Sequence, residues 1–256
     1  MSTDGFAARL RDRQTLIGYW MSADSPVLTE RIATVGYDYV GVDGQHGVPS
    51  PGTWPLLMMA VDAGQVSAGV LRVPSADPIL IGAALDAGAR AVVVPMVDTP
   101  QQAAVAARAC RHWPHGTRSL AGPVRAELRM GSVPAALDEA AGCIVMIETA
   151  AAYRNLAGIC ATPGVDAVYI GPADLTIALG GRHVGDPEAA GALERALKEV
   201  AGAAAEHGVA AGIHCPDGRT AAARLAQGFT FATVSSDVTH LHQAAAGHLA
   251  AARSGS

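Results

Sequence analysis

The amino-acid sequence predicts an α/β protein with the (β/α)8 TIM-barrel fold, and three observations support this. Eight short apolar runs alternate with alanine-rich helical segments along the chain, which is typical of βα units around a parallel sheet. The chain has 256 residues, of which 50% are hydrophobic, enough for one barrel with a large core. It lacks the Gly-x-Gly-x-x-Gly sequence that opens a dinucleotide-binding fold. We therefore expect one barrel domain over residues 1–256 and no nucleotide cofactor.

The predicted strands are apolar runs that suit burial on both faces of a sheet. In chain order they are Thr15–Trp20, Tyr37–Val42, Ala68–Val73, Ala91–Pro95, Cys143–Ile147, Val165–Ile170, Ala210–His214 and Phe229–Val234.

The predicted helices lie between these strands, and several are followed by a glycine in the left-handed conformation that ends a helix. The helices are Pro26–Val35, Gly52–Ala63, Pro78–Ala87, Pro100–Cys110, Ala150–Ala161, Pro187–His207, Gly218–Gln227 and Val238–Ala252. The terminal glycines are Gly36, Gly64, Gly88, Gly208 and Gly228.

Two segments fall outside this pattern. The connection at about 113–134 is rich in Gly, Pro and Arg and is too long for an ordinary loop, so we expect a lid or an insertion over the site. The tail at about 251–256 is expected to be frayed.

Composition limits the kinds of partner that the protein is expected to bind and indicates its cell compartment. A net charge of −5 gives no reason to expect nucleic acid or an acidic membrane as a partner. No signal peptide or membrane-spanning stretch is visible. The four cysteines are scattered, with no Cys-x-x-Cys spacing, and read as buried, reduced cysteines of a cytoplasmic protein.

Two acidic residues at the ends of successive predicted strands suggest a metal site. Glu148 follows Cys143–Ile147, and Asp174 follows Val165–Ile170. In a parallel barrel the carboxyl ends of the strands share one rim, so two carboxylates there suit Mg²⁺, Mn²⁺ or a similar ion. The alternative is that Glu148 pairs with an arginine and Asp174 only caps a helix.

The break at Gly171-Pro172 is expected to start a helix directly after a strand. Gly171 permits close backbone approach, and Pro172 fits the first helical turn. The free amides of Ala173 and Asp174 would then form an anion site above the strand.

The same rim carries candidate groups for proton transfer and charge stabilisation. Asp43 and His46 follow a strand, and a carboxylate against an imidazole prepares the histidine as a general base; simple turn chemistry at Asp43-Gly44 is the alternative. Arg72 ends another strand and is expected to hold an enolate oxygen, with an ion pair to Asp43 or Glu148 as a compatible alternative.

Lys198 is the only lysine in the chain. It lies off the buried stripe formed by Leu193, Leu197 and Val200, and Glu194 precedes it by four residues, which indicates a solvated pair. Covalent imine catalysis needs a desolvated lysine inside the barrel, so we expect no imine chemistry.

Five segments together resemble the class II pyruvate aldolases of the hydroxy-oxo-heptanedioate aldolase (HpcH/HpaI) family, in the phosphoenolpyruvate/pyruvate superfamily. They are Gly36-Tyr37-Asp38-Tyr39-Val40-Gly41-Val42-Asp43-Gly44-Gln45-His46-Gly47, Leu85-Asp86-Ala87-Gly88-Ala89, Val94-Pro95-Met96-Val97, Ile147-Glu148-Thr149 and Ile170-Gly171-Pro172-Ala173-Asp174-Leu175.

The resemblance implies a divalent metal cofactor (Mg²⁺, Mn²⁺ or Co²⁺) and a reaction between pyruvate and an aldehyde, or the cleavage of a 4-hydroxy-2-oxo acid. It implies Glu148 and Asp174 as metal ligands, the Ala173 and Asp174 amides for the pyruvate carboxylate, and Trp20 as a pocket residue. It also implies a homohexamer, built as a trimer of dimers, in which the last helix is exchanged between subunits.

Three departures from the family concern the second substrate. The family often has an apolar residue at His214 and a glycine at Ser235, and Gly116-Thr117-Arg118-Ser119 replaces the commoner Gly-x-Arg-Gly. His214 is a candidate contact for a hydroxyl or carboxylate of the acceptor aldehyde, and the alternative is a rim histidine with no role. Two alternative functions are an acyl-CoA lyase of the malyl-CoA or citramalyl-CoA type and a catalytically silent keto-acid-binding barrel.

Overall fold

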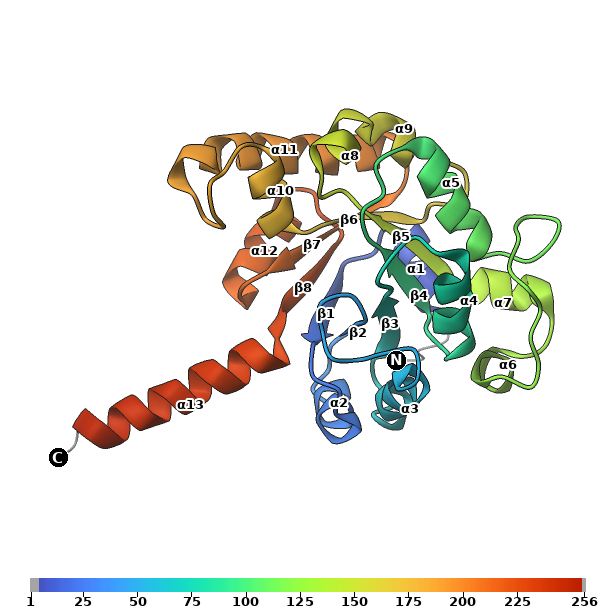
Figure 1. The fold of residues 1–256 in the computed structure, drawn as a ribbon, viewed down its shortest axis with the longest axis horizontal. Helices are drawn as coiled ribbons and strands as arrows, with labels where there is room; N and C mark the ends of the chain where they lie inside the picture. The colour runs from blue at the N-terminus through green and yellow to red at the C-terminus, as the bar shows by residue number, and fades with distance from the viewer. Residues whose placement is uncertain (1–4, 255–256) are drawn as a thin grey trace.

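Eight parallel strands close into a barrel in sequence order, as predicted, in a computed structural model that describes residues 5–254 (Figure 1). Each strand pairs with its neighbours along the chain, and β8 pairs with β1 to close the sheet. The strands are β1 Leu16–Met21, β2 Tyr39–Asp43, β3 Ala68–Arg72, β4 Ala91–Val94, β5 Gly142–Met146, β6 Ala167–Ile170, β7 Ala210–Cys215 and β8 Phe231–Ser236. All eight overlap the predicted ranges.

The helices follow the strands around the outside of the barrel (Figure 1). They are α1 Phe6–Arg11, α2 Pro26–Ala33, α3 Trp54–Ala63, α4 Pro78–Asp86, α5 Pro100–Ala109, α6 Arg125–Met130, α7 Pro134–Ala140, α8 Ala150–Arg154, α9 Leu156–Cys160, α10 Pro172–Ala178, α11 Pro187–Glu206, α12 Gly218–Ala226 and α13 Asp237–Ser254. The prediction missed α1, α6 and α7, which are too short to show a clear period. It also treated 150–161 as one helix, whereas the structure divides that range at Asn155.

Predicted helix ends were confirmed at four of the five glycines. Gly36, Gly88, Gly208 and Gly228 have positive φ angles. The prediction was wrong at Gly64, whose φ is −67°, and the left-handed residue is its neighbour Gln65. Gly64 is instead required for packing, because a Cβ there would lie 2.6 Å from the Cβ of Ala33 on α2.

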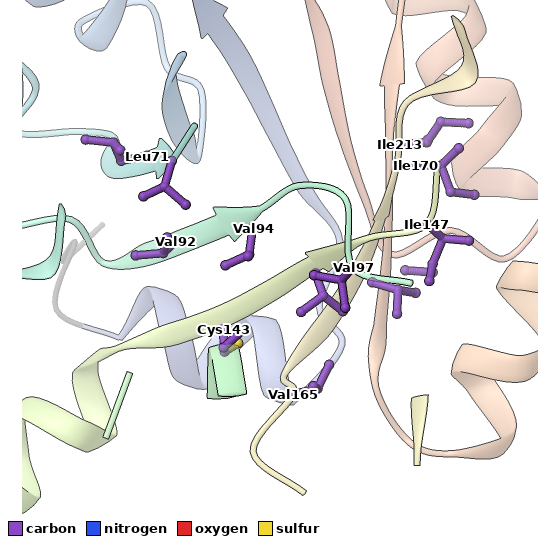
Figure 2. Packing of buried hydrophobic residues seen from close by; sticks show 14 of the residues in the cluster. Leu71, Val92, Val94, Val97, Cys143, Ile147, Val165, Ile170 and Ile213 are labelled. Atoms are coloured by element: carbon purple, nitrogen blue, oxygen red, sulfur yellow. The ribbon is translucent and has the colours of Figure 1, made fainter. Parts of the chain in front are cut away.

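The core has two layers because alternate residues of each strand face opposite sides. In β4, Val92 and Val94 face the helices, while Ala91 and Val93 face the barrel interior. Figure 2 shows part of this outer layer, with Leu71 of β3, Val92 and Val94 of β4, and Cys143 of β5 in one hydrophobic cluster. The two apolar faces explain why the strands read as continuous hydrophobic runs.

Large aromatic rings fill the barrel interior opposite glycines. A Cβ at Gly18 would lie 2.1 Å from the ring of Tyr39, and one at Gly212 would lie 2.1 Å from the ring of Phe231. The Thr233 hydroxyl hydrogen-bonds to the hydroxyls of Tyr39, at 2.6 Å, and Tyr169, at 2.7 Å. The interior is therefore a packed core and not a channel.

The N-terminal helix α1 closes the end of the barrel opposite the carboxyl ends of the strands. Phe6 and Leu10 are buried against the interior cluster. Arg11 bonds to the carboxylate of Asp166 at 2.8 Å and to the Ala141 carbonyl at 2.9 Å. This helix lies in a segment that looks polar and charged in the sequence.

The segment at about 113–134 does not cover the predicted site, so the expectation of a lid was wrong. It follows α5 and leads into β5, and a connection that enters a strand lies at the amino end of the barrel. Arg118 bonds to Asp86 at 2.8 Å, and Arg125 pairs with Asp62. These ion pairs attach the segment to the ends of α4 and α3, so it is an insertion at the opposite face.

The last helix, α13, extends away from the barrel, and none of its residues is buried (Figure 1). Its first turns are attached by Asp237, which accepts hydrogen bonds from the amides of Ser22 and Ala23, and by His240, which bonds to the Tyr19 hydroxyl. The helix continues to Ser254, where fraying from residue 251 was expected; residues 255–256 lie outside the described range.

All four cysteines are buried and free, as predicted. Among residues 5–254, no helix has the length and apolarity needed to cross a membrane.

Candidate functional site

The carboxyl ends of the strands surround a cavity of about 570 Å³, which we call the rim cavity. Eight of the ten residues selected from the sequence line it: Trp20, His46, Arg72, Gly171, Pro172, Ala173, Asp174 and His214. The other two, Asp43 and Glu148, are buried behind this surface. Cavities of about 400 and 560 Å³ at the opposite face, beside α1 and α7, contain none of the ten.

Glu148 and Asp174 face a common point next to Gly171. A Cβ built on Gly171 would lie 3.4 Å from Oε2 of Glu148 and 3.6 Å from Oδ2 of Asp174. It would also lie 3.3 Å from Cε of Met146, so glycine keeps this space open for something other than a side chain. The partner that Glu148 has in the structure is a backbone amide, not an arginine.

The electrostatics of Glu148 fit a bound cation. Burial raises the pKa of Glu148, the Met96 amide lowers it, and the nearby Asp174 raises it again, with a net upward shift. A divalent ion between the two carboxylates would offset both the burial and the repulsion. The described residues contain no cluster of three or more His, Cys, Asp or Glu side chains of metal-site geometry, so water and substrate oxygens would complete the coordination.

The loop between β4 and α5 holds Glu148 in position. The amide of Met96 donates to Oε1 of Glu148 at 2.8 Å, and Met96 adopts a left-handed φ of 57°. Two residues later, Asp98 accepts a hydrogen bond from the hydroxyl of Thr149, the neighbour of Glu148. The sequence reasoning missed both residues, although Met96 lies in the segment Val94-Pro95-Met96-Val97 that carries the family resemblance.

Asp43 contacts Arg72 and does not contact the imidazole of His46, which corrects the expected pairing. Nε of Arg72 bonds to Oδ1 of Asp43 at 2.9 Å, and Nη2 bonds to Oδ2 at 2.7 Å. The amides of Gln45 and His46 also donate to Oδ1. The local turn satisfies the carboxylate with backbone amides and leaves the His46 ring exposed at the cavity.

This ion pair keeps Asp43 ionised and holds the Arg72 guanidinium in one orientation. Burial acts to raise the pKa of Asp43, but the Arg72 guanidinium and the two amides outweigh it, so the pKa is lowered. A bidentate pair with two buried members orients the guanidinium strongly. One edge of Arg72 remains available on the side of the rim cavity.

Trp20 links the charged groups to His214. Cζ of Arg72 lies 5.2 Å from the centroid of the Trp20 ring, a cation–π distance. Trp20 stacks on Tyr169 at 6.1 Å and meets the His214 ring edge-on at 6.0 Å. Burial lowers the pKa of His214, and Arg72 lowers it further, so the imidazole is neutral at physiological pH.

The start of α10 agrees with the predicted strand–Gly–Pro–helix arrangement. Gly171 precedes the helix, Pro172 takes its first position, and the first intrahelical acceptor, the Gly171 carbonyl, binds Leu175. The amides of Ala173 and Asp174 therefore have no acceptor within the helix and lie at the cavity, beside the two carboxylates.

The sequence reasoning did not select the cavity residues that come from β1, β8 and α13. Ser22, Ser235, Ser236, Thr239 and Gln243 also line the rim cavity. The serine at position 235, where the family often has glycine, could have pointed to this part of the cavity. Ser235 has a φ of 53°, in the left-handed region that favours glycine.

Lys198 is exposed on α11 and is not among the residues that line the rim cavity. The expected pair with Glu194 was wrong, because Glu194 bonds to Arg224 at 2.5 and 2.7 Å instead. Leu197 and Val200 are buried, and Leu193 packs against the core, as predicted.

Comparison with known proteins gives consistent matches over nearly the whole chain. Residues 16–244 match the HpcH/HpaI aldolase/citrate lyase family. A hydroxypyruvate/pyruvate aldolase of Delftia acidovorans is 36% identical, over 95% of this chain and 90% of the relative. A 5-keto-4-deoxy-D-glucarate aldolase of Klebsiella pneumoniae is 35% identical, over 91% of this chain and 90% of the relative. The crystal structure of an HpcH/HpaI aldolase/citrate lyase family protein from Burkholderia cenocepacia superposes with a TM-score of 0.88, at 35% identity, over 98% of this chain and 99% of that one.

Proposed function

The chain belongs to the HpcH/HpaI aldolase/citrate lyase family and is a lyase, and from this premise we propose that it is a metal-dependent pyruvate aldolase. It joins pyruvate to an aldehyde, or cleaves a 4-hydroxy-2-oxo acid to the same two products. The similar aldolases are matched over about nine-tenths of their length.

One observation carries the proposal: two carboxylates face the same small space beside a buried arginine. Glu148 and Asp174 approach the point that a Cβ of Gly171 would occupy, and Arg72 lines the same cavity. These residues would hold Mg²⁺, Mn²⁺ or Co²⁺, with oxygen ligands of the kind that hard divalent ions prefer. When bound there, the ion acts as a Lewis acid that makes the methyl protons of pyruvate more acidic.

The protein's own groups place the keto acid and handle its charge. The amides of Ala173 and Asp174 are directed at the pyruvate carboxylate, as the family resemblance implies. Arg72, fixed by Asp43, donates to the keto oxygen as negative charge develops on it. Trp20 packs against Arg72 and provides an apolar wall for the substrate.

Proton transfer is assigned to His46. Its ring is exposed at the cavity and is not engaged by Asp43, so it can exchange a proton with the pyruvate methyl group directly or through water. Asp43 acts on this step through the His46 amide and through Arg72, and not as a direct partner of the imidazole.

The assembly proposed is a cytoplasmic homohexamer in which α13 is exchanged between subunits. The support is the shape of the chain: α13 projects from its own barrel with no buried residue. Val238, Leu241 and Leu249 are exposed on it and, with Ala245, follow one another at intervals of three or four residues. Such spacing forms one apolar stripe along a helix, which a neighbouring subunit would cover.

The test is activity with and without metal. Protein treated with a chelator and desalted should neither form aldol product from pyruvate and an aldehyde nor decarboxylate oxaloacetate, which passes through the same enolate. Addition of Mn²⁺ or Mg²⁺ should restore both activities. Full aldol turnover by the metal-free protein would rule out the mechanism.

A further inference from the structure

The rim cavity has two chemically different ends. One end, formed by Arg72 and Gly171–Asp174, carries the charges and backbone amides assigned above to pyruvate. The other, which we call the acceptor end, is formed by Ser22, His214, Ser235, Ser236, Thr239 and Gln243. In the closed barrel, β8 and β1 lie across from β4 and β5, so the acceptor end faces the proposed metal site from the other side of the same rim.

The acceptor end is rich in hydroxyl and amide groups. The hydroxyls of Ser236 and Thr239 lie 2.8 Å apart, and the Thr239 amide also donates to Ser236 at 3.3 Å. Gln243 follows Thr239 by four residues, so both side chains project from the same face of α13 toward the cavity. These groups can donate and accept hydrogen bonds, as can the neutral imidazole of His214.

No lysine or arginine lines the acceptor end within residues 5–254. Arg72 lies at the other end, where it pairs with Asp43 and presents its free edge to the keto oxygen of pyruvate. The first turn of α13 carries a negative charge: Asp237 accepts hydrogen bonds from the amides of Ser22 and Ala23 at 2.8 and 3.0 Å. A carboxylate on the acceptor would therefore meet repulsion from Asp237 and find no lysine or arginine of the described residues lining this end.

Accepting the proposed aldolase function, we infer that the acceptor end selects a short, uncharged hydroxyaldehyde, whose hydroxyl groups bind to Thr239, Gln243 and His214. The methyl carbon of pyruvate, after losing one proton, forms a bond to the aldehyde carbon. The aldehyde oxygen gains one proton, so the product is a polyhydroxylated 4-hydroxy-2-oxo acid that contains all atoms of both substrates.

The first experiment measures kcat/KM for three aldehydes with saturating pyruvate and Mn²⁺. Glyceraldehyde offers two hydroxyls, propanal offers none, and succinate semialdehyde carries a negative charge. We expect kcat/KM for glyceraldehyde to exceed each of the others at least tenfold. Propanal would leave the hydroxyl and amide groups of the acceptor end without hydrogen-bond partners, and the carboxylate of succinate semialdehyde would find no counter-charge. A preference for succinate semialdehyde, or equal values for glyceraldehyde and propanal, would overturn the inference.

The second experiment tests the named side chains. Thr239→Val and Gln243→Leu should each lower the ratio of kcat/KM for glyceraldehyde to that for propanal by roughly tenfold, mainly through KM. Thr34→Val and Gln101→Leu, exposed residues on other elements, are the matched controls and should keep the wild-type ratio. An equal fall for both aldehydes would show a merely structural role and contradict the assignment.

Failure of this inference can be separated from failure of the proposed function. Oxaloacetate decarboxylation and exchange of the pyruvate methyl protons, followed by NMR, use only the end that binds pyruvate. If the wild-type protein performs both but does not prefer glyceraldehyde, the acceptor inference alone is wrong. If it performs neither with any metal, the proposed function is wrong, and the inference falls with it.

Discussion

At the scale of single residues, the site contains buried charged side chains, and each of them needs a partner because burial removes it from water. Asp43 and Arg72 are both buried and form a bidentate ion pair, so the guanidinium is held in one orientation with its free edge at the rim cavity. Glu148 is equally buried, but within residues 5–254 its hydrogen-bond partner is the single amide of Met96, which leaves its charge poorly compensated. The first arrangement orients Arg72, whereas the second is the arrangement expected of a carboxylate proposed to bind a cation.

Arg72→Ala should lower kcat for aldol formation and for oxaloacetate decarboxylation by ~10²–10³-fold, since it removes a donor to the developing enolate oxygen. Steady-state kinetics at saturating pyruvate and metal would measure this. Because the substitution also leaves Asp43 buried without its partner, a circular dichroism spectrum and a melting curve must accompany it. A loss of less than threefold in a folded variant would contradict the role.

Glu148→Gln should raise the Tm of the metal-free protein at pH 7 while abolishing activity and the rise in Tm on adding Mn²⁺. The pKa of Glu148 is raised above its usual 4.5, so the ionised form costs stability at pH values above the folded-state pKa. The gain in Tm should therefore disappear as the pH falls toward 4.5. Differential scanning calorimetry across this range tests the sign, and a lower Tm for the variant at pH 7 would refute it.

At the scale of elements, hydrogen bonds join two loops that follow neighbouring strands, next to the proposed metal site. The loop after β4 contacts the loop after β5 through the Met96 amide and the Asp98 carboxylate. Asn155 also donates to the Asp98 carbonyl at 2.8 Å, and Thr149 caps α8 through the Ala152 amide. These hydrogen bonds hold the carboxylate of Glu148 and the neighbouring Thr149 in position.

Asp98→Ala should weaken Mn²⁺ binding by about 10–100-fold, the usual effect of removing a residue that orients a metal ligand. Isothermal titration calorimetry with the metal alone measures this without relying on turnover. Asp12→Ala, an exposed aspartate at the opposite face, is the matched control and should bind as the wild type does. An unchanged dissociation constant for Asp98→Ala would show that the Met96 amide suffices.

At the scale of the whole molecule, the amino face of the barrel is closed, whereas the carboxyl face contains the candidate site. The amino face is closed by α1 and by the insertion at 113–134, through ion pairs such as Arg11–Asp166 and Arg118–Asp86. The carboxyl face carries the cavity and the start of α13. The departure at Gly116-Thr117-Arg118-Ser119 lies at the amino face, where Arg118 bonds to Asp86, and not at the rim cavity of its own chain.

Leu241→Glu should reduce the oligomer to smaller species, because it places a charge in the apolar stripe of α13 that a second subunit is proposed to cover. Ala250→Glu, on the other side of the same helix, is the control and should leave the assembly intact. Light scattering coupled to size-exclusion chromatography measures the mass. A monomeric wild-type protein, or a hexamer unaffected by Leu241→Glu, would contradict the proposed exchange.

The sequence by itself determined the barrel, the order of its strands and the set of residues at its rim. This was possible because apolar runs, helix caps and glycine stops are local, and because the carboxyl ends of parallel strands necessarily share one face. Only the tertiary structure decided which rim groups pair. Asp43 is bound to Arg72 instead of the His46 ring, and Met96 is bound to Glu148. Such pairings join residues from different strands, and burial selects among several chemically reasonable partners, so no local pattern records the outcome.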